Sequence, residues 1–179
     1  MTKTTCSELR KGELQLQPLD VNEILHNALK LVRSDLVNHK VTLHTEFAPH
    51  LPAVNGDGVQ LQQVLLNLVV NGCDAMADVE ATGRRLLVRT ELANEKEVRV
   101  SVVDQGCGIP PEKIKRIFEP FFTTKRNGMG LGLEVCLSII SGHGGRLWAT
   151  NNAERGATFV FTLPINSEGT SLARALLKT

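Results

Sequence analysis

Residues 57–78 of this 179-residue chain read DGVQLQQVLLNLVVNGCDAMAD, and the pattern within this stretch predicts one long helix. Asp57 has the side chain of an N-cap residue, and Gln60 stands where a capping box places Glu or Gln. Apolar residues recur at the spacing of a single helical face, which predicts that this face packs on the core. They are Leu61, Val64, Leu65, Leu68, Val69 and Met76.

The same predicted helix carries a polar stripe, whose members fall within an arc of about 80°. They are Gln60, Gln63, Asn67, Asn71, Asp74 and Asp78. A solvated face is the ordinary explanation of such a stripe, but solvated faces usually carry Glu, Lys and Arg. Asn and Asp are poor helix formers, so their presence in mid-helix indicates that a polar ligand covers the stripe. An amide oxygen also suits Mg²⁺.

Composition narrows the possible partners. The formal net charge is +1, from 20 basic and 19 acidic residues, and this balance indicates neither a nucleic-acid nor an anionic-membrane partner. No apolar run approaches the roughly 18 residues of a membrane span, and the first residues lack a signal-peptide core. The four cysteines are widely spaced without a CxxC pair, which favours reduced thiols in a cytoplasmic protein. The length fits one domain.

The remaining pattern predicts an α+β fold. Residues 1–18 are interpreted as a linker or the end of a preceding helix, 19–164 as the domain, and 165–179 as a C-terminal tail. Helices are predicted at 21–37, 111–117, from the glycines near 128 to 142, and at 172–177; strands are predicted at 41–47, 86–92, 98–102, 147–151 and 157–163. This order is not a strict βαβ alternation, so it favours a mixed, mostly antiparallel sheet with helices on one face.

Two glycine-rich segments are candidate binding loops. Asp104 ends a predicted strand and is followed by Gly106 and Gly108, so its carboxylate can accept a hydrogen bond from an exocyclic amine such as that of adenine; taken alone, an ordinary β-turn explains it equally well. Residues 128–133, GMGLGL, open a helix whose free N–H groups suit an anion, with Lys125 nearby; taken alone, a flexible loop is the ordinary explanation. Neither the Walker pattern nor the dinucleotide GxGxxG context is present.

Together these features describe a site for ATP and Mg²⁺. Four segments, LLNLVVNGCDAM, VVDQGCGIP, IFEPFFTTK and GMGLGL, occur in an order and spacing that resemble the N, G1, F and G2 boxes of sensor histidine kinases, most of all the nitrogen-regulation and oxygen-sensing branch. The resemblance covers residues 19–164. It implies a two-layer α/β sandwich of the Bergerat type, shared with gyrase B and a heat-shock chaperone.

The resemblance also implies roles for individual residues. Asn71 resembles the Mg²⁺ ligand, Asn67 its partner one turn earlier, and Asp104 the adenine-binding aspartate, which Thr158 helps to hold through water. Residues 118–127 resemble a mobile lid, in which Lys125 reaches phosphate. The full set implied for ATP binding is Asn67, Asn71, Asp74, Asp104, Gly106, Gly108, Ile109, Thr123, Thr124, Lys125, Gly128, Gly130, Leu131, Gly132, Leu133 and Thr158. Beyond ATP positioning by Asn67 and Lys125, no catalytic residue is expected.

The chain departs from the family pattern at several positions. Gly72 stands where Ala is usual, which weakens a helix by up to about 1 kcal/mol. Met129 stands where Thr or Ser is common, so a hydroxyl contact to phosphate is expected to be missing. The lid is short. Asn67 stands where the ATP-hydrolysing relatives have Glu, and an amide cannot act as a general base.

These observations predict phosphoryl transfer to a protein histidine and disfavour a gyrase-type ATPase. None of His26, His39, His44, His50 or His143 lies in a phosphoacceptor motif such as His-Glu-x-x-Asn/Thr-Pro. The chain is therefore expected to be a monomeric catalytic domain, inactive in autophosphorylation alone, whose homodimeric parent carries the dimerisation and phosphoacceptor helices and signals to a response regulator. Membrane anchorage of the parent is left open. The alternative is a nucleotide-gated binding module, such as a degenerate kinase or an anti-sigma-like regulator.

Overall fold

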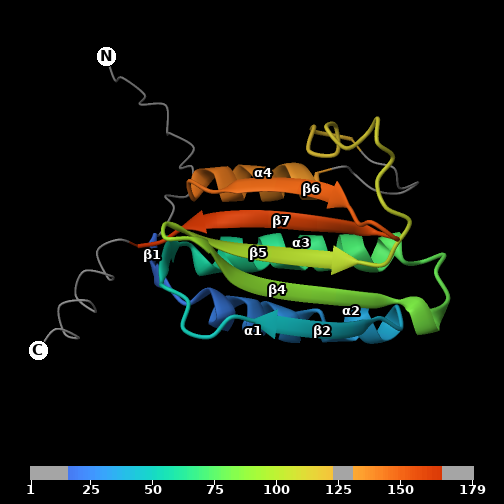
Figure 1. The fold of residues 1–179 in the computed structure, drawn as a ribbon, viewed down its shortest axis with the longest axis horizontal. Coiled ribbons are helices and arrows are strands. Elements are labelled where there is room, and N and C mark those ends of the chain that lie inside the picture. Colours follow the sequence, from blue (N-terminus) through green and yellow to red (C-terminus); the bar gives the residue numbers. More distant parts are fainter. Residues whose placement is uncertain (1–15, 123–130, 167–179) are drawn as a thin grey trace, which may run out of the picture.

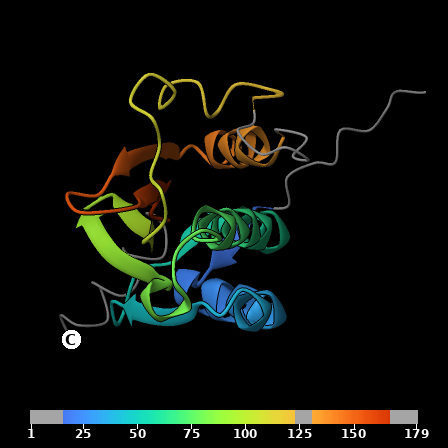
Figure 2. The same ribbon diagram turned by 90° about the vertical axis from the view of Figure 1, so that its right-hand side faces the viewer.

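The computed structural model describes residues 16–122 and 131–166 of the chain. Its elements form two layers, with the helices on one face of a sheet (Figures 1 and 2). In chain order they are β1 (Gln17–Leu19), α1 (Val21–Leu31), α2 (Arg33–Asn38), β2 (Thr42–Phe47), β3 (Val54–Gly56), α3 (Gly58–Ala75), a 3-10 turn η1 (Ala81–Gly83), β4 (Arg85–Asn94), β5 (Glu97–Asp104), α4 (Gly132–Gly142), β6 (Arg146–Asn151) and β7 (Ala157–Pro164).

The main sheet has five strands in the order β2-β4-β5-β7-β6. Strands β2 and β4 are parallel, and the other three pairs are antiparallel. This arrangement confirms the predicted two-layer α/β sandwich with a mixed, mostly antiparallel sheet. The carboxyl end of β5, where Asp104 lies, is at the right in Figure 1, whereas the β4–β5 hairpin is at the left.

The helix starts follow the predicted capping residues. The Asp57 carboxylate accepts from the N–H groups of Val59 and Gln60 at 3.0 and 3.2 Å, and Asp20 caps α1 in the same way. A buried histidine adds a tertiary contact, because the Nε2 atom of His143, at the end of α4, accepts from the Asp57 N–H at 2.9 Å. The start of α3 is therefore fixed both by its own cap and by α4.

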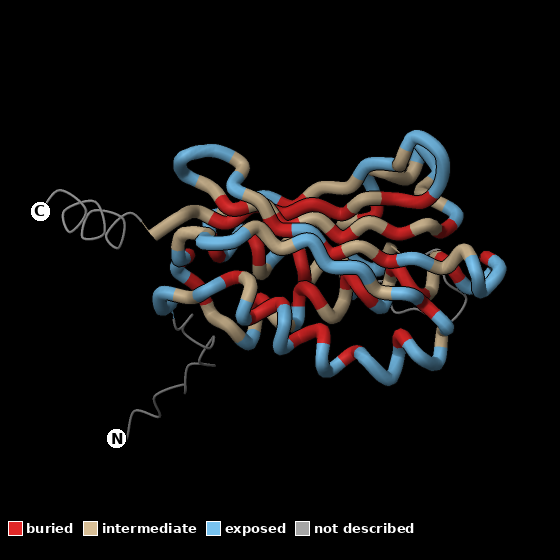
Figure 3. Tube along the Cα trace, turned by 60° about the horizontal axis from the view of Figure 1, so that its bottom comes forward, coloured by how far each residue is buried: buried red, intermediate tan, exposed pale blue. Residues whose placement is uncertain are grey.

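The core lies between the helices and the inner face of the sheet, where the buried stretches of Figure 3 face one another. The apolar face of α3 is almost fully buried, as predicted, with Val64, Leu65, Leu68 and Val69 at 0% exposure. It packs between α1 and α4 and against the inward residues of β4 and β5. Burying each such side chain stabilises the fold by about 1.5–3 kcal/mol, so α3 anchors both layers.

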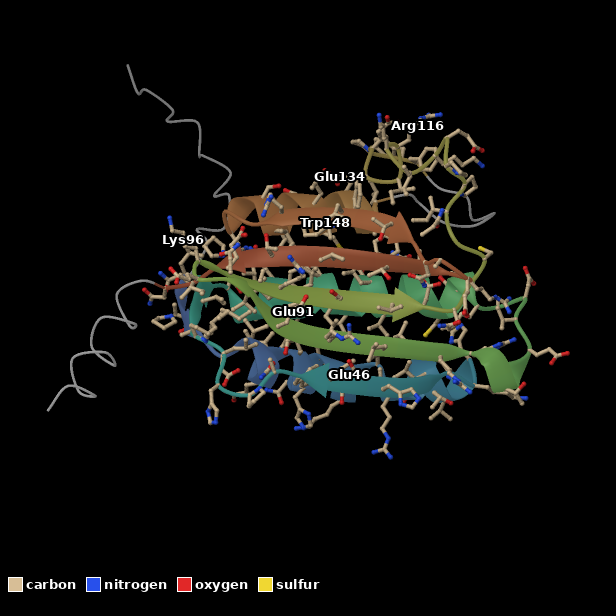
Figure 4. The ribbon with its side chains drawn as sticks, viewed as in Figure 1. Glu46, Glu91, Lys96, Arg116, Glu134 and Trp148 are labelled. Atoms are coloured by element: carbon tan, nitrogen blue, oxygen red, sulfur yellow. The ribbon has the colours of Figure 1, made fainter. Side chains whose placement is uncertain are left out.

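Among residues 16–122 and 131–166, no helix covers the opposite face of the sheet, which is lined by charged pairs. Arg89 pairs with Glu46 at 2.6 Å, and Arg99 pairs with Glu91 at 3.0 Å. Figure 4 shows Glu46, Glu91 and Trp148 on this face.

Two expectations about local structure are wrong. Residues 111–117 form successive turns and not a helix, although the Ile117 N–H reaches the Lys113 carbonyl at 3.1 Å. A helix of about seven residues is too short to be stable by itself. The helix predicted at 21–37 is interrupted at Val32, which separates α1 from α2.

A small second sheet was not predicted. Strand β1 pairs antiparallel with β3, and Val54 of β3 also bridges Ile165. Both short strands lack the alternation that reveals longer strands, since each has three residues. The boundary expected between residues 18 and 19 therefore falls within a strand, and β3 joins the two ends of the described domain. The helix expected at 172–177 lies outside the described residues.

Candidate functional site

The polar stripe of α3 contacts the first turn of α4 through Asn67. Its members Asn67, Asn71 and Asp74 are half-buried, whereas Gln63 and Asp78 are exposed. The Asn67 side-chain amide donates to the Gly132 carbonyl at 3.4 Å. The structure thus brings together the asparagine stripe and the start of the second glycine segment, which are 65 residues apart in the sequence.

Asp104 lies at the other border of this region, at the end of β5. Its side chain is on the helix side of the sheet and only 2% of the residue is exposed. Oδ1 accepts from the Gly106 N–H at 2.7 Å and from the Ala157 N–H at 3.3 Å. Burial raises the pKa of this carboxyl group, and the two N–H donors oppose that rise. The protein therefore holds a desolvated carboxylate in a fixed orientation, which is costly unless a partner uses it.

The backbone around Asp104 is packed so closely that only glycine fits at several positions. A Cβ atom at Gly156 would lie 2.0 Å from the Asp104 carbonyl oxygen, and one at Gly106 would lie 2.6 Å from the Ala75 carbonyl oxygen. Gly156 also has a φ of +83°. The end of α3, the loop after β5 and the start of β7 therefore converge on this carboxylate.

The structure gives a steric reason for glycine at position 72. A Cβ atom at this position would lie 2.7 Å from Leu86 Cδ1 and 3.5 Å from Asp104 Cβ. Leu86 is fully buried on β4, so the space that an alanine methyl group would need is already filled. The departure from the family pattern is therefore matched by a large neighbour on the sheet.

The loop after Asp104 is held by the β6–β7 hairpin, through two asparagines that the sequence predictions missed. Asn151 bonds both the N–H and the carbonyl of Ile109, each at 2.7 Å. Asn152 donates to the Asp104 carbonyl at 2.9 Å. Their only signal in the sequence is that they begin the segment NNAERG (residues 151–156), and asparagines and a glycine are typical of any hairpin turn.

Thr158 is not brought to the Asp104 carboxylate. Across the β5–β7 ladder its direct partner is Val103, so its side chain lies on the face away from the helices. Its hydroxyl donates to the side-chain oxygen of Asn152 at 2.6 Å. Thr158 therefore reaches the site only through Asn152, and Ala157 occupies the position beside Asp104.

Of the remaining predicted residues, some belong to the described part of the chain and the others lie outside it. Leu131, Gly132 and Leu133 form the start of α4, and Asp74 lies 3.7 Å from the ring of His39. Outside the described residues lie Thr123, Thr124, Lys125, Gly128 and Gly130, together with Met129 and the second half of the expected lid, residues 123–127.

Two cysteines near the stripe, Cys73 and Cys136, are buried in the core, whereas Cys107 is exposed. Cys73, Cys107 and Cys136 are free thiols in the described part of the chain. Burial raises the pKa of Cys73 and of Cys136 to about 11, so both stay protonated at neutral pH.

In residues 16–122 and 131–166, no group of three or more His, Cys, Asp or Glu side chains is placed to hold a metal ion. No helix in these ranges is long and apolar enough to cross a membrane.

Comparison with known proteins places the chain in a family. Residues 56–167 match the model of the histidine kinase-, DNA gyrase B- and HSP90-like ATPases. The sensor protein TdiS of Thauera aromatica is 41% identical over 149 residues, which are 83% of this chain and 27% of TdiS. The chain therefore spans about a quarter of this relative.

Solved structures show the same fold. The nucleotide-free catalytic domain of the histidine kinase ThkA superposes with a TM-score of 0.75 at 33% identity, covering 86% of this chain and 97% of that domain. Full-length ShkA, solved in complex with AMPPNP, superposes with a TM-score of 0.75 at 28% identity, covering 86% of this chain and 32% of ShkA.

Proposed function

Since the chain belongs to the histidine kinase-, DNA gyrase B- and HSP90-like ATPase family and its relatives are sensor histidine kinases, we propose that it binds ATP with Mg²⁺ and donates the γ-phosphoryl group to a histidine of a separate phosphoacceptor domain. The observation that carries the proposal is the buried Asp104 carboxylate, held by two backbone N–H groups beside the asparagine stripe. The AMPPNP bound by ShkA supports a nucleotide site on this fold.

Asp104 is the residue proposed to recognise the base. An adenine offers an exocyclic amine, and a carboxylate accepts a hydrogen bond from it more strongly than a neutral group does. Oδ1 is already oriented by Gly106 and Ala157, so the carboxylate is set in place before a ligand binds. Gly106, Gly108 and Ile109 form the loop against which the base is proposed to lie.

The α3 stripe and the start of α4 are proposed to hold the phosphates and the metal. The donor set fits Mg²⁺, because this ion prefers hard oxygen ligands and is usually held by few protein groups together with phosphates and water. Asn71 supplies such an oxygen, and bound Mg²⁺ would neutralise phosphate charge. Residues 128–133 would provide N–H groups for the phosphates, with Thr123, Thr124 and Lys125 adding hydroxyls and charge.

Asn67 favours phosphoryl transfer over ATP hydrolysis. Its side chain is an amide that donates to the Gly132 carbonyl, and no amide removes a proton from water. In the proposed reaction the bond between the γ-phosphorus and the β–γ bridging oxygen breaks, a bond to an imidazole nitrogen of the acceptor forms, and ADP leaves. This chain contributes positioning and charge, and the acceptor comes from another domain of the parent.

The experiment that tests this function is transfer in trans. The chain is mixed with the phosphoacceptor helix pair of its parent, Mg²⁺ and γ-labelled ATP, and label on the helix pair is followed. We expect slow labelling, because the covalent tether is absent, and loss of labelling in Asp104→Asn but not in Asp35→Asn, an exposed aspartate of α2. ATP binding without any labelling would favour the alternative, a nucleotide-gated binding module.

A further inference from the structure

The hairpin between β6 and β7 contacts the loop after Asp104 through a side chain that imitates a peptide group. The Oδ1 atom of Asn151 accepts from the Ile109 N–H, and its Nδ2 atom donates to the Ile109 carbonyl, both at 2.7 Å. These are the two bonds that a neighbouring strand would make with Ile109. The loop is thereby bound as if it were paired, although it belongs to no sheet.

Only asparagine has the groups for this contact at this distance. The N–H of Ile109 can only donate and its carbonyl can only accept, so the partner must present one acceptor and one donor side by side. Aspartate has the same size but no donor, and its charge would face the Ile109 carbonyl. Alanine would leave both backbone groups without the side-chain partner.

Asn152 fixes the other end of the same loop. Its Nδ2 atom donates to the carbonyls of Asp104 and Arg155, both at 2.9 Å, and its Oδ1 atom accepts from the Thr158 hydroxyl at 2.6 Å. Gly156 permits this approach, because any larger residue would collide with Asp104. Asn151 and Asn152 thus hold residues 104–109 at both ends, and neither contact uses the Asp104 side chain.

We propose that Asn151 and Asn152 are positioning residues for base recognition, a role that rests on the proposed function of Asp104. They hold the loop in its binding shape before the nucleotide arrives, so binding does not have to order the loop and loses less conformational entropy. Neither residue needs to touch the nucleotide. Thr158 belongs to the same assembly, because its hydroxyl orients the Asn152 amide from the far face of the sheet.

The test compares two ligands on Asn151→Ala and Asn151→Asp. Affinities for ATP and for inorganic tripolyphosphate, which lacks the base, are measured with Mg²⁺ by isothermal titration or competition. The matched control is Asn94→Ala, since Asn94 is also an exposed hairpin asparagine that bonds backbone and lies at the opposite end of the sheet, beside the Lys96 labelled in Figure 4. Thermal unfolding of every variant is recorded.

We expect both Asn151 variants to weaken ATP binding by about tenfold, the effect of losing one to two ordinary hydrogen bonds. Tripolyphosphate should bind each Asn151 variant nearly as well as it binds the unchanged chain, and Asn94→Ala should leave both affinities unchanged. Unaltered ATP affinity in both Asn151 variants would overturn the inference. Equal losses for ATP and tripolyphosphate would overturn it too, because they would show general structural damage. If the unchanged chain bound no ATP, the proposed function itself would fail.

Discussion

Replacing Asp104 by asparagine removes a charge from the site with little change in shape. The new Oδ1 atom can still accept from the N–H groups of Gly106 and Ala157, which now hold the carboxylate at 2.7 and 3.3 Å. The Nδ2 atom then takes the place of the second carboxylate oxygen. If Asp104 binds the base as proposed, the Nδ2 donor of the asparagine would face the amine of adenine, where the carboxylate oxygen accepts in the unchanged chain. Recognition of the base should therefore be lost while the fold remains.

The expected magnitude follows from the loss of a charged acceptor. A hydrogen bond to a charged group is worth about 1.5–3 kcal/mol, which corresponds to roughly a tenfold to more than a hundredfold loss of ATP affinity. Two donors facing each other add to this loss, so ATP binding should fall below what a calorimeter measures at ordinary protein concentrations.

The stability of the folded chain should not fall with the ATP affinity in Asp104→Asn. Burial raises the pKa of Asp104, so the folded chain holds this proton more tightly than the unfolded chain does. Stability contributed by this group is therefore lost as pH rises above the unfolded value of about 3.9. The asparagine variant escapes that loss and should be at least as stable as the unchanged chain at neutral pH, with the advantage disappearing in acid.

The assay combines isothermal titration of ATP with urea unfolding at neutral and acidic pH, with Asp35→Asn as the control. Unchanged ATP affinity in Asp104→Asn would refute the assignment of the adenine-binding group. A marked loss of stability at neutral pH would refute the argument from burial, because the lost binding would then reflect unfolding.

Three further predictions concern the elements around the site. Asn71→Ala should weaken ATP binding with Mg²⁺ far more than without it; equal losses in titrations under both conditions would show that Asn71 is not the metal ligand. Arg84→Ala should destabilise the fold by about 2–3 kcal/mol, because the Arg84 guanidinium bonds three backbone carbonyls at 2.7–2.8 Å, and unchanged urea unfolding would contradict this. Gly72→Ala should destabilise by about 1 kcal/mol, since crowding against Leu86 outweighs the gain in helix propensity, and Leu86→Val should relieve that loss in the double variant; strict additivity in unfolding experiments would refute the crowding.

Local patterns predicted the parts of the site that depend on one element. The caps of α1 and α3, the buried face of α3 and the strand that ends at Asp104 are confirmed, because capping residues and apolar periodicity act within a few residues. Family resemblance then placed Asp104 and Asn67 in one site; in the structure Asn67 contacts Gly132 of α4, and Gly72 of the same helix lies close to Asp104.

Features that depend on register or distant contacts were not predictable in this way. A shift of one residue along a strand reverses the face of every side chain, and family resemblance, which suggested that Thr158 helps to hold Asp104 through water, does not specify the register that places Thr158 opposite Val103. Asn151 bonds a residue 42 positions away, and nothing in its local sequence distinguishes it from a turn asparagine. Strands β1 and β3 are defined only by their pairing with each other.

The most direct test of the account is a titration of the unchanged chain with ATP and Mg²⁺, followed through backbone amide signals in nuclear magnetic resonance. The account predicts saturable shifts at Asn71, Gly106, Ile109 and Gly132, while Lys96 at the far hairpin stays unaffected. Absence of saturable shifts at these amides, or shifts centred on the far hairpin, would contradict the claim that the α3 stripe and the loop after Asp104 form one ATP site.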